Sequence, residues 1–198
     1  MGGGFTSRNH AKESWLHFHR SGGPSIPNPV SPSLVVLVMG VAGAGKTTVA
    51  QLLAERLGCR FLEGDDFHPA ANVEKMRRGQ PLSDADRLPW LQQIAASIDG
   101  LQAQGRCGVI TCSALKRRYR EILIGRRKDV KLVFLTGPIE LIGGRLAGRQ
   151  GHFMPPALLE SQFASLEPPG ADEQPIIADA TGEPAAIVEG ILGALDRQ

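Results

Sequence analysis

The apolar residues of this chain gather in short runs that alternate with segments of helical spacing. Residues 34–39 form an unbroken apolar run, and residues 47–57 follow with apolar side chains three or four positions apart. A strand with no polar face is typical of the centre of a parallel sheet, because helices cover it on both sides. Gly58 then predicts the end of the helix, since glycine is favoured just beyond a helix C-terminus.

The alternation continues to the end of the chain. Further strands are predicted at 59–62, 107–112, 130–136 and 175–178, and further helices at 73–78, 89–104, 116–124, 139–148, 156–165 and 184–195. Residues 83–86 resemble a capping box ahead of the helix at 89–104, and Pro89 suits the first turn of that helix. Alternating strands and helices indicate an α/β fold, a doubly wound parallel sheet of five strands in one domain, residues 34–198.

Residues 1–33 have a different composition. Gly, Ser and Pro fill 15 of these 33 positions, and no apolar period runs through them. Such a segment buries too little surface to offset its conformational entropy, so we expect a flexible tail. It lacks the apolar stretch of a secretory signal, while weak similarities to a transit peptide and to a myristoylation pattern remain open as alternatives.

Composition narrows the classes of partner and compartment. The net charge of +2 gives no general reason to expect nucleic acid or an anionic membrane surface as a partner. The apolar run at 34–39 is far shorter than the about 20 residues that span a bilayer. Cys59, Cys107 and Cys112 are too few and odd in number for a disulfide framework, so we expect reduced thiols and a cytoplasmic protein.

The strongest local motif lies between the first strand and the first helix. Residues 40–48 read GVAGAGKTT and match G-x-x-x-x-G-K-[ST], the loop whose backbone N–H groups surround the phosphates of a nucleotide. Lys46 can reach the β- and γ-phosphates, and the Thr47 hydroxyl can bind Mg²⁺. The motif predicts binding of ATP with Mg²⁺. The nucleotide-binding residues are then Gly40, Gly43, Ala44, Gly45, Lys46, Thr47 and Thr48.

An acidic segment follows the second predicted strand. Residues 61–69 read FLEGDDFHP, and Glu63 and Asp65 project from the same side if the chain is extended there. Asp65 can then orient an attacking hydroxyl or accept its proton, and Glu63 can hold water on Mg²⁺. Two alternatives stay open: Asp65 or Asp66 caps the next helix, and His68 is either a substrate contact or a turn residue.

Four blocks of the sequence resemble the gluconokinase family. They are residues 61–76, 81–91, 112–120 and 150–155, and with the phosphate loop they cover most of residues 34–180. The resemblance implies ATP-dependent phosphorylation of D-gluconate at its 6-hydroxyl to give 6-phosphogluconate. It also implies a fold like that of nucleoside monophosphate kinases and commonly a homodimer. One departure is Glu63, which stands where the family often has an aspartate.

Gluconate carries a carboxylate and a chain of hydroxyls, so its pocket needs a cation. Arg87, Lys116 and Arg117 are the candidates, because a guanidinium can hold a carboxylate through two parallel hydrogen bonds and Lys116 and Arg117 directly follow the third strand. Arg118 and Arg120 lie on a basic helix face, and we expect both to be solvated.

Arg145 and Arg149 lie four residues apart, on one helix face. This segment resembles the lid-entry helix of adenylate-kinase-like enzymes. The resemblance implies that Arg145 contacts adenine, that Arg149 reaches the phosphates, and that a helical lid lies around residues 145–165. Phosphoryl transfer spreads negative charge over oxygens, and a positioned arginine stabilises it. Two solvated arginines are the alternative.

Three other functions remain as alternatives. A kinase of the same fold can act on another small hydroxy acid, such as shikimate. An ATP-binding regulatory module without catalysis is less favoured, because Lys46, Thr47, Asp65 and Arg149 are all present. A nucleic-acid binder that uses residues 116–120 lacks the interleaved aromatic residues of such surfaces.

Overall fold

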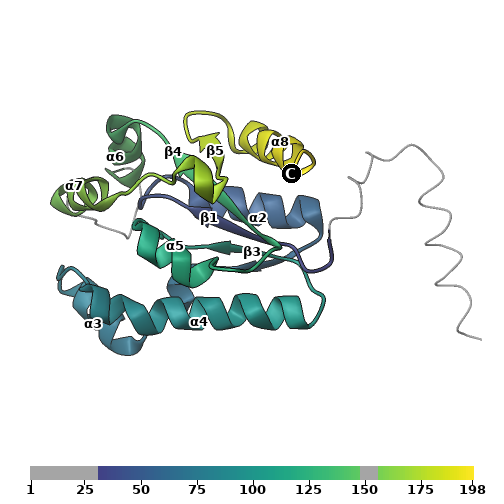
Figure 1. Ribbon diagram of the computed structural model, residues 1–198. Helices are drawn as coiled ribbons and strands as arrows, with labels where there is room; N and C mark the ends of the chain where they lie inside the picture. The colour runs from purple at the N-terminus through teal and green to yellow at the C-terminus, as the bar shows by residue number, and fades with distance from the viewer. Residues whose placement is uncertain (1–30, 148–155) are drawn as a thin grey trace, which may run out of the picture.

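A parallel sheet of five strands organises the molecule (Figure 1). The computed structural model describes residues 31–147 and 156–198. All strand pairings in this part are parallel, in the order β2-β3-β1-β4-β5. The strands are β1 (Val35–Met39), β2 (Arg60–Leu62), β3 (Gly108–Thr111), β4 (Val130–Thr136) and β5 (Ile176–Asp179). The predicted doubly wound α/β fold is confirmed.

Helices cover both faces of the sheet. On one face lie α2 (Lys46–Leu57) and α8 (Pro184–Leu195), and on the other lie α4 (Asp84–Ala103) and α5 (Arg117–Leu123). The remaining helical elements are η1 (Gly64–Phe67), α3 (Ala70–Arg77), α6 (Ile139–Ala147), α7 (Pro156–Ser165) and η2 (Ala171–Glu173). Alternate residues of β1 enter the two separate cores, which is why that strand has no polar position.

The start of α4 differs from the prediction. Ser83 caps this helix: its Oγ accepts the Asp86 N–H at 3.2 Å, and Asp86 Oδ2 accepts the Ser83 N–H at 2.8 Å. The helix therefore begins at Asp84, and Pro89 is its sixth residue rather than its first turn. The predicted capping box is confirmed, but the boundary placed at Pro89 is wrong, because the cap starts the helix directly after Ser83 and Pro89 then lies inside it.

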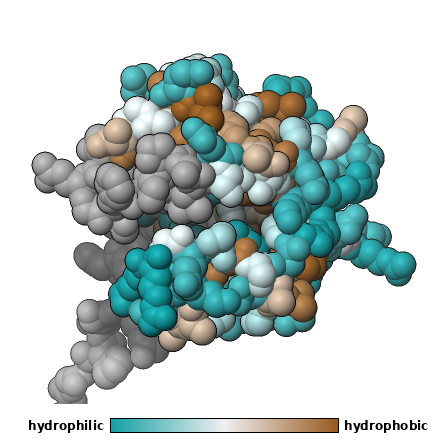
Figure 2. Space-filling model, turned by 90° about the vertical axis from the view of Figure 1, so that its left-hand side faces the viewer, coloured by the Kyte–Doolittle hydropathy of each residue, from teal (hydrophilic) through white to brown (hydrophobic). Residues whose placement is uncertain are grey.

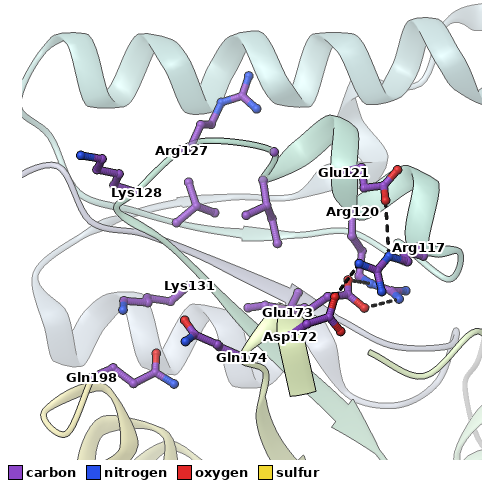
Figure 3. A pocket seen from close by; sticks show the side chains of 14 residues that line it. Arg117, Arg120, Glu121, Arg127, Lys128, Lys131, Asp172, Glu173, Gln174 and Gln198 are labelled. Carbon is purple, nitrogen blue, oxygen red and sulfur yellow. Dashed lines mark hydrogen bonds and ion pairs between the residues drawn. The ribbon is translucent and has the colours of Figure 1, made fainter. Parts of the chain in front are cut away.

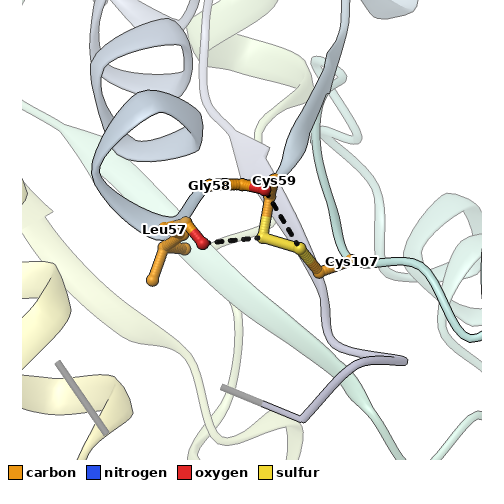
Figure 4. The surroundings of a disulfide bond; sticks show 4 residues. All are labelled: Leu57, Gly58, Cys59 and Cys107. Carbon is orange, nitrogen blue, oxygen red and sulfur yellow. Dashed lines mark hydrogen bonds between the residues drawn. A yellow bond between two sulfur atoms is a disulfide. The ribbon is translucent and has the colours of Figure 1, made fainter. Parts of the chain in front are cut away.

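The expectation of reduced thiols is wrong for two of the three cysteines. Cys59 and Cys107 form a disulfide with a Cα–Cα distance of 5.0 Å (Figure 4). They directly precede β2 and β3, which are neighbours in the sheet. Sequence spacing alone carries no sign of this pairing. Cys112 remains a free thiol, and burial raises its pKa to about 12.

Arg120 also differs from its expected solvated position. The residue is 1% exposed, and its guanidinium pairs with Glu173 of η2. Arg118, by contrast, is exposed as expected and pairs with Asp84. The two residues lie on different sides of α5, so the charge of the segment alone does not distinguish the buried arginine from the exposed one.

In the described part of the chain, no helix is both long and apolar enough to cross a bilayer. On the face shown in Figure 2, hydrophobic residues form separate patches among hydrophilic ones. Most of the expected tail, residues 1–30, lies outside the described residues, as does Arg149.

Candidate active site

The phosphate loop connects β1 to the N-terminus of α2. Gly40, Gly43 and Gly45 have φ of 147°, 82° and 94°, a region that L side chains rarely adopt. A Cβ on Gly40 would lie 2.4 Å from the carbonyl oxygen of Leu135, and one on Gly43 would lie 2.5 Å from Leu146 Cγ. The loop therefore requires glycine at these positions, and the helix that follows directs its N-terminal N–H groups toward the loop.

The phosphate loop is contacted by its own lysine and by side chains from α6 and α7. Lys46 Nζ donates to the Val41 carbonyl at 3.0 Å, and the Ala42 N–H donates to Gln162 Oε1 at 2.7 Å. Arg145 Nη1 lies 3.9 Å from the Cβ position of Gly45, so the structure brings Arg145 to the loop. No local sequence pattern predicted Gln162, because it lies 120 residues from Ala42 in the chain and belongs to no motif.

Thr47 and Glu63 meet beside the loop. Thr47 Oγ1 donates to Glu63 Oε2 at 2.7 Å, which joins the first turn of α2 to the end of β2. A hydroxyl and a carboxylate are hard oxygen ligands of the kind that Mg²⁺ prefers, so these residues fit the ion. Thr111 Oγ1 donates to the other carboxylate oxygen of Glu63. Thr111 was not among the site residues predicted from the sequence.

Asp65 lies on η1 with its side chain exposed. Among the described residues its carboxylate has no hydrogen bond or ion pair. It does not cap α3, because Pro69 occupies the N-cap position and no side chain caps this helix; Asp66 does not cap it either. The charges of Asp65, Lys46 and Arg87 all affect the pKa of the buried Cys112 thiol, after burial itself, so all three groups belong to the neighbourhood of that residue.

His68 belongs to the same neighbourhood. Its ring stacks on Trp90 with centroids 4.1 Å apart and planes 16° apart. Burial lowers the pKa of His68 below 6.5, the Arg87 charge lowers it further, and the Asp65 charge opposes both. A pKa below 6.5 favours the neutral imidazole at pH 7, with its ring stacked on Trp90.

The basic candidates differ in their partners. Within the described part of the chain the Arg87 guanidinium has no ion pair, and it lies 6.0 Å from the Tyr119 ring centroid. The Lys116 Nζ lies 5.8 Å from the centroid of the same Tyr119 ring and 3.3 Å from Asp84 Oδ1. Of these two cations, Arg87 is therefore the one that has no ion pair in the described part of the chain.

Arg117 lies apart from these residues. Its Nη2 is 2.5 Å from Asp172 Oδ2, and its Nε is 3.4 Å from Glu121 Oε1. Both contacts line a polar pocket of about 300 Å³ between α5, η2 and the start of β4 (Figure 3). No residue of the phosphate loop lines this pocket, so the structure does not bring Arg117 to the loop.

A phosphate loop at the carboxyl edge of a parallel sheet, with the Glu63 carboxylate hydrogen-bonded to Thr47 beside it, is typical of the class of P-loop kinases. The family model described as "AAA domain" matches residues 35–169. The chain is 50% identical over 160 residues to the gluconokinase of Gluconobacter oxydans, which covers 79% of this chain and 88% of that protein.

Two solved structures agree with this match. A sugar kinase from Janibacter sp. is 45% identical with a TM-score of 0.78, covering 82% of this chain and 94% of its own. A gluconokinase from Sinorhizobium meliloti is 39% identical with a TM-score of 0.75, covering 84% and 94%. This chain belongs to the gluconokinase family and is a kinase.

The shikimate alternative has weaker support. A shikimate kinase from Bacteroides thetaiotaomicron is 19% identical with a TM-score of 0.61, covering 82% of this chain and 98% of its own. A likeness at this identity shows the fold alone. The acceptor therefore has to be argued from the family and from the side chains opposite the phosphate loop.

Proposed function

We propose that this protein transfers the γ-phosphoryl group of ATP to the 6-hydroxyl of D-gluconate, giving 6-phospho-D-gluconate and ADP. The observation that carries the proposal is the Thr47–Glu63 hydrogen bond of 2.7 Å, which places the acidic segment that contains Asp65 beside the phosphate loop. A phosphate-loop cation, an unpaired carboxylate and an unpaired guanidinium are the three groups that an anionic alcohol acceptor needs beside ATP. Membership of the gluconokinase family supports the same acceptor.

The nucleotide occupies the phosphate loop in this proposal. Backbone N–H groups of the loop and the N-terminus of α2 hold its phosphates, and Arg145 contacts the adenine. Arg149 supplies a further cation to the transferring group from a lid around residues 145–165; Arg149 itself lies outside the described residues. The proposed nucleotide-binding residues are Gly40, Gly43, Ala44, Gly45, Lys46, Thr47, Thr48 and Arg145.

Mg²⁺ is the cofactor that the loop implies. Thr47 and Glu63 would hold it, directly or through water, since both offer oxygen ligands at one place. When bound, the ion neutralises charge on the β- and γ-phosphate oxygens.

Gluconate binds on the other side of the site. Arg87 holds its carboxylate, because this guanidinium has no ion pair among the described residues, and Lys116 assists from the Tyr119 ring. Neutral His68 accepts or donates one hydrogen bond to a sugar hydroxyl. The proposal leaves Arg117 out, since Asp172 and Glu121 hold its guanidinium in another pocket.

Asp65 positions the reacting alcohol. The 6-oxygen attacks the γ-phosphorus in line, forming an O6–P bond while the bond from the γ-phosphorus to the β,γ-bridging oxygen breaks. The hydroxyl proton passes to Asp65, and ADP leaves with the electron pair of the broken bond. Lys46 and Arg149 offset the negative charge that develops on the phosphoryl oxygens.

An acceptor panel tests the proposal. The purified protein is given MgATP with D-gluconate, shikimate or a nucleoside monophosphate, and ADP release is followed in a coupled assay. We expect ADP release in excess of the acceptor-free rate with gluconate and not with the other two. Product phosphorylated at the 6-position is then identified by ³¹P NMR. A preference for shikimate, or ADP release independent of any acceptor, would contradict the proposal.

A homodimer in the cytoplasm is proposed on the resemblance to the family. The disulfide removes the argument from reduced thiols, so the cytoplasmic location needs its own test by cell fractionation. Sedimentation equilibrium of the full chain measures the oligomeric state, with twice the monomer mass of 21.2 kDa expected.

A further inference from the structure

Thr111 links the end of β3 to the acidic segment that follows β2. It is the last residue of β3 and is 0% exposed. Its hydroxyl oxygen accepts the Gly64 N–H at 2.9 Å, and its proton is donated to Glu63 Oε1. A threonine hydroxyl has one proton to donate, so accepting from Gly64 and donating to Glu63 gives it a definite orientation.

The peptide between Glu63 and Asp65 is held from several sides. The Gly64 N–H is bound by Thr111, and the Gly64 carbonyl accepts the indole N–H of Trp90 at 2.7 Å. A Cβ on Gly64 would lie 1.9 Å from the Thr111 carbonyl oxygen, so only glycine allows this close approach. The backbone that presents Glu63 and Asp65 is therefore fixed against the end of β3.

The carboxylate of Glu63 is held at both oxygens. Oε1 accepts from Thr111 and Oε2 accepts from Thr47, the phosphate-loop residue expected to bind Mg²⁺. Glutamate has one more rotatable bond than the aspartate that the family resemblance leads one to expect here. A second anchor reduces the number of orientations available to this longer side chain.

We propose that Thr111 is a positioning residue that holds Glu63 in the orientation required at the Mg²⁺ side of the phosphate loop. This inference rests on the proposed nucleotide site but not on the identity of the acceptor. Thr111 does not touch the reacting atoms. Its effect passes through Glu63, so removing the hydroxyl should act like loosening that carboxylate, with the Thr47 side chain still in place.

The test compares Thr111→Val, which keeps the shape and removes the hydroxyl, with Thr111→Ser, which keeps the hydroxyl. Partners that orient metal-binding side chains typically change metal affinity by about 10- to 100-fold. We expect Thr111→Val to need about 10-fold more Mg²⁺ to bind ADP in isothermal titration calorimetry, and Thr111→Ser to stay within about twofold of the wild type. This readout needs no acceptor, so it is independent of whether gluconate is the substrate.

A second readout uses the protein without metal. Hydrogen exchange of the Gly64 amide should be faster in Thr111→Val than in wild type, because its hydrogen-bond acceptor is gone. Thr136→Val is the matched control: Thr136 ends β4, which is separated from β3 by β1 in the sheet, and its hydroxyl has no hydrogen bond among the described residues. We expect neither the Mg²⁺ requirement nor Gly64 exchange to change in this control.

A double-mutant cycle separates positioning from packing. In a Glu63→Gln background, Thr111→Val should alter the Mg²⁺ requirement by less than about twofold, since the group through which Thr111 acts has already changed. Should Thr111→Val fail to fold, Thr111→Ala replaces it and should raise the Mg²⁺ requirement similarly, because it also removes the hydroxyl that holds Glu63. A wild-type Mg²⁺ requirement in Thr111→Val, or a loss that Thr111→Ser shares, would overturn the proposal.

Discussion

Arg120 and Glu173, 53 residues apart, form a buried ion pair with two hydrogen bonds, Nε–Oε2 at 2.6 Å and Nη2–Oε1 at 2.9 Å. The Arg120 Nη1 donates to the carbonyls of Ala114 at 3.1 Å and Glu167 at 2.9 Å. The hydrogen bonds from Arg120 lower the pKa of Glu173 below its ordinary value. This pair joins α5 to η2, in the segment that precedes β5.

Removing one partner of this pair should destabilise the fold. Arg120→Met leaves the Glu173 carboxylate, 12% exposed, without its cation. Breaking a fully buried ion pair costs about 3–5 kcal/mol of the free energy of unfolding, so we expect a loss toward the lower end of that range. Urea denaturation measures the loss. Arg118→Met, on the exposed side of the same helix, is the control and should cost less than about 1 kcal/mol. Equal stability of the two variants would show that the buried pair contributes nothing.

Asp65 should be needed for turnover but not for nucleotide binding. Asp65→Asn keeps the size of the side chain and removes its ability to take a proton. General base catalysis contributes about 10²- to 10⁴-fold, so kcat with gluconate should fall by that factor, while the affinity for MgADP stays within about twofold. Asp66→Asn, the exposed neighbour, is the control. Full turnover in Asp65→Asn would show that the carboxylate neither accepts the proton nor orients the hydroxyl.

Arg87 should determine the affinity for the acceptor. A hydrogen bond to a charged group contributes about 1.5–3 kcal/mol, so Arg87→Met should raise the KM for gluconate by about 10- to 100-fold. The KM for ATP should change little. Arg117→Met provides a control of equal charge, because Arg117 lies in the separate pocket of Figure 3. The reverse outcome, with Arg117→Met raising the KM and Arg87→Met leaving it, would place the acceptor carboxylate elsewhere.

Local sequence patterns predicted the features that depend on neighbouring residues. The buried strand β1, the loop after it and the capping box at Ser83 all depend on residues a few positions apart. The pairings that depend on tertiary packing were not predicted. The Cys59–Cys107 disulfide and the Thr111–Glu63 hydrogen bond both form because β2 and β3 are neighbours in the sheet. Strand order is not readable from the spacing of residues along the chain.

The same reason explains why the prediction of a solvated Arg120, in the basic segment after β3, is wrong. Arg117, Arg118 and Arg120 are chemically alike in the sequence, yet one lies in a side pocket, one is exposed and one is buried. Their different positions depend on which carboxylates of α4 and η2 pack against α5. Residues from these elements are between 34 and 55 positions away, so the local pattern contains no information about them.

His68 should make stability depend on pH. Its pKa is below 6.5 in the folded protein, with burial as the main cause. As pH falls through 6.5, the unfolded chain takes up a proton that the folded protein does not, so stability falls until the folded pKa is passed. Urea denaturation from pH 8 to 5 should show a steeper loss for wild type than for His68→Phe, which keeps an aromatic ring against Trp90 and does not titrate. Parallel curves for the two proteins would contradict the neutral, half-buried imidazole.

The disulfide should leave one thiol per chain, and that thiol should be inert. Burial raises the pKa of Cys112 to about 12, so the folded protein should give almost no reaction with Ellman's reagent at pH 8. Unfolded without reductant it should show one thiol, and unfolded with reductant three. The bond closes a loop between residues 48 positions apart, and its removal in Cys59→Ser/Cys107→Ser should cost about 2–4 kcal/mol of the free energy of unfolding. Three thiols in the unreduced, unfolded chain would show that the two cysteines remain unpaired in solution.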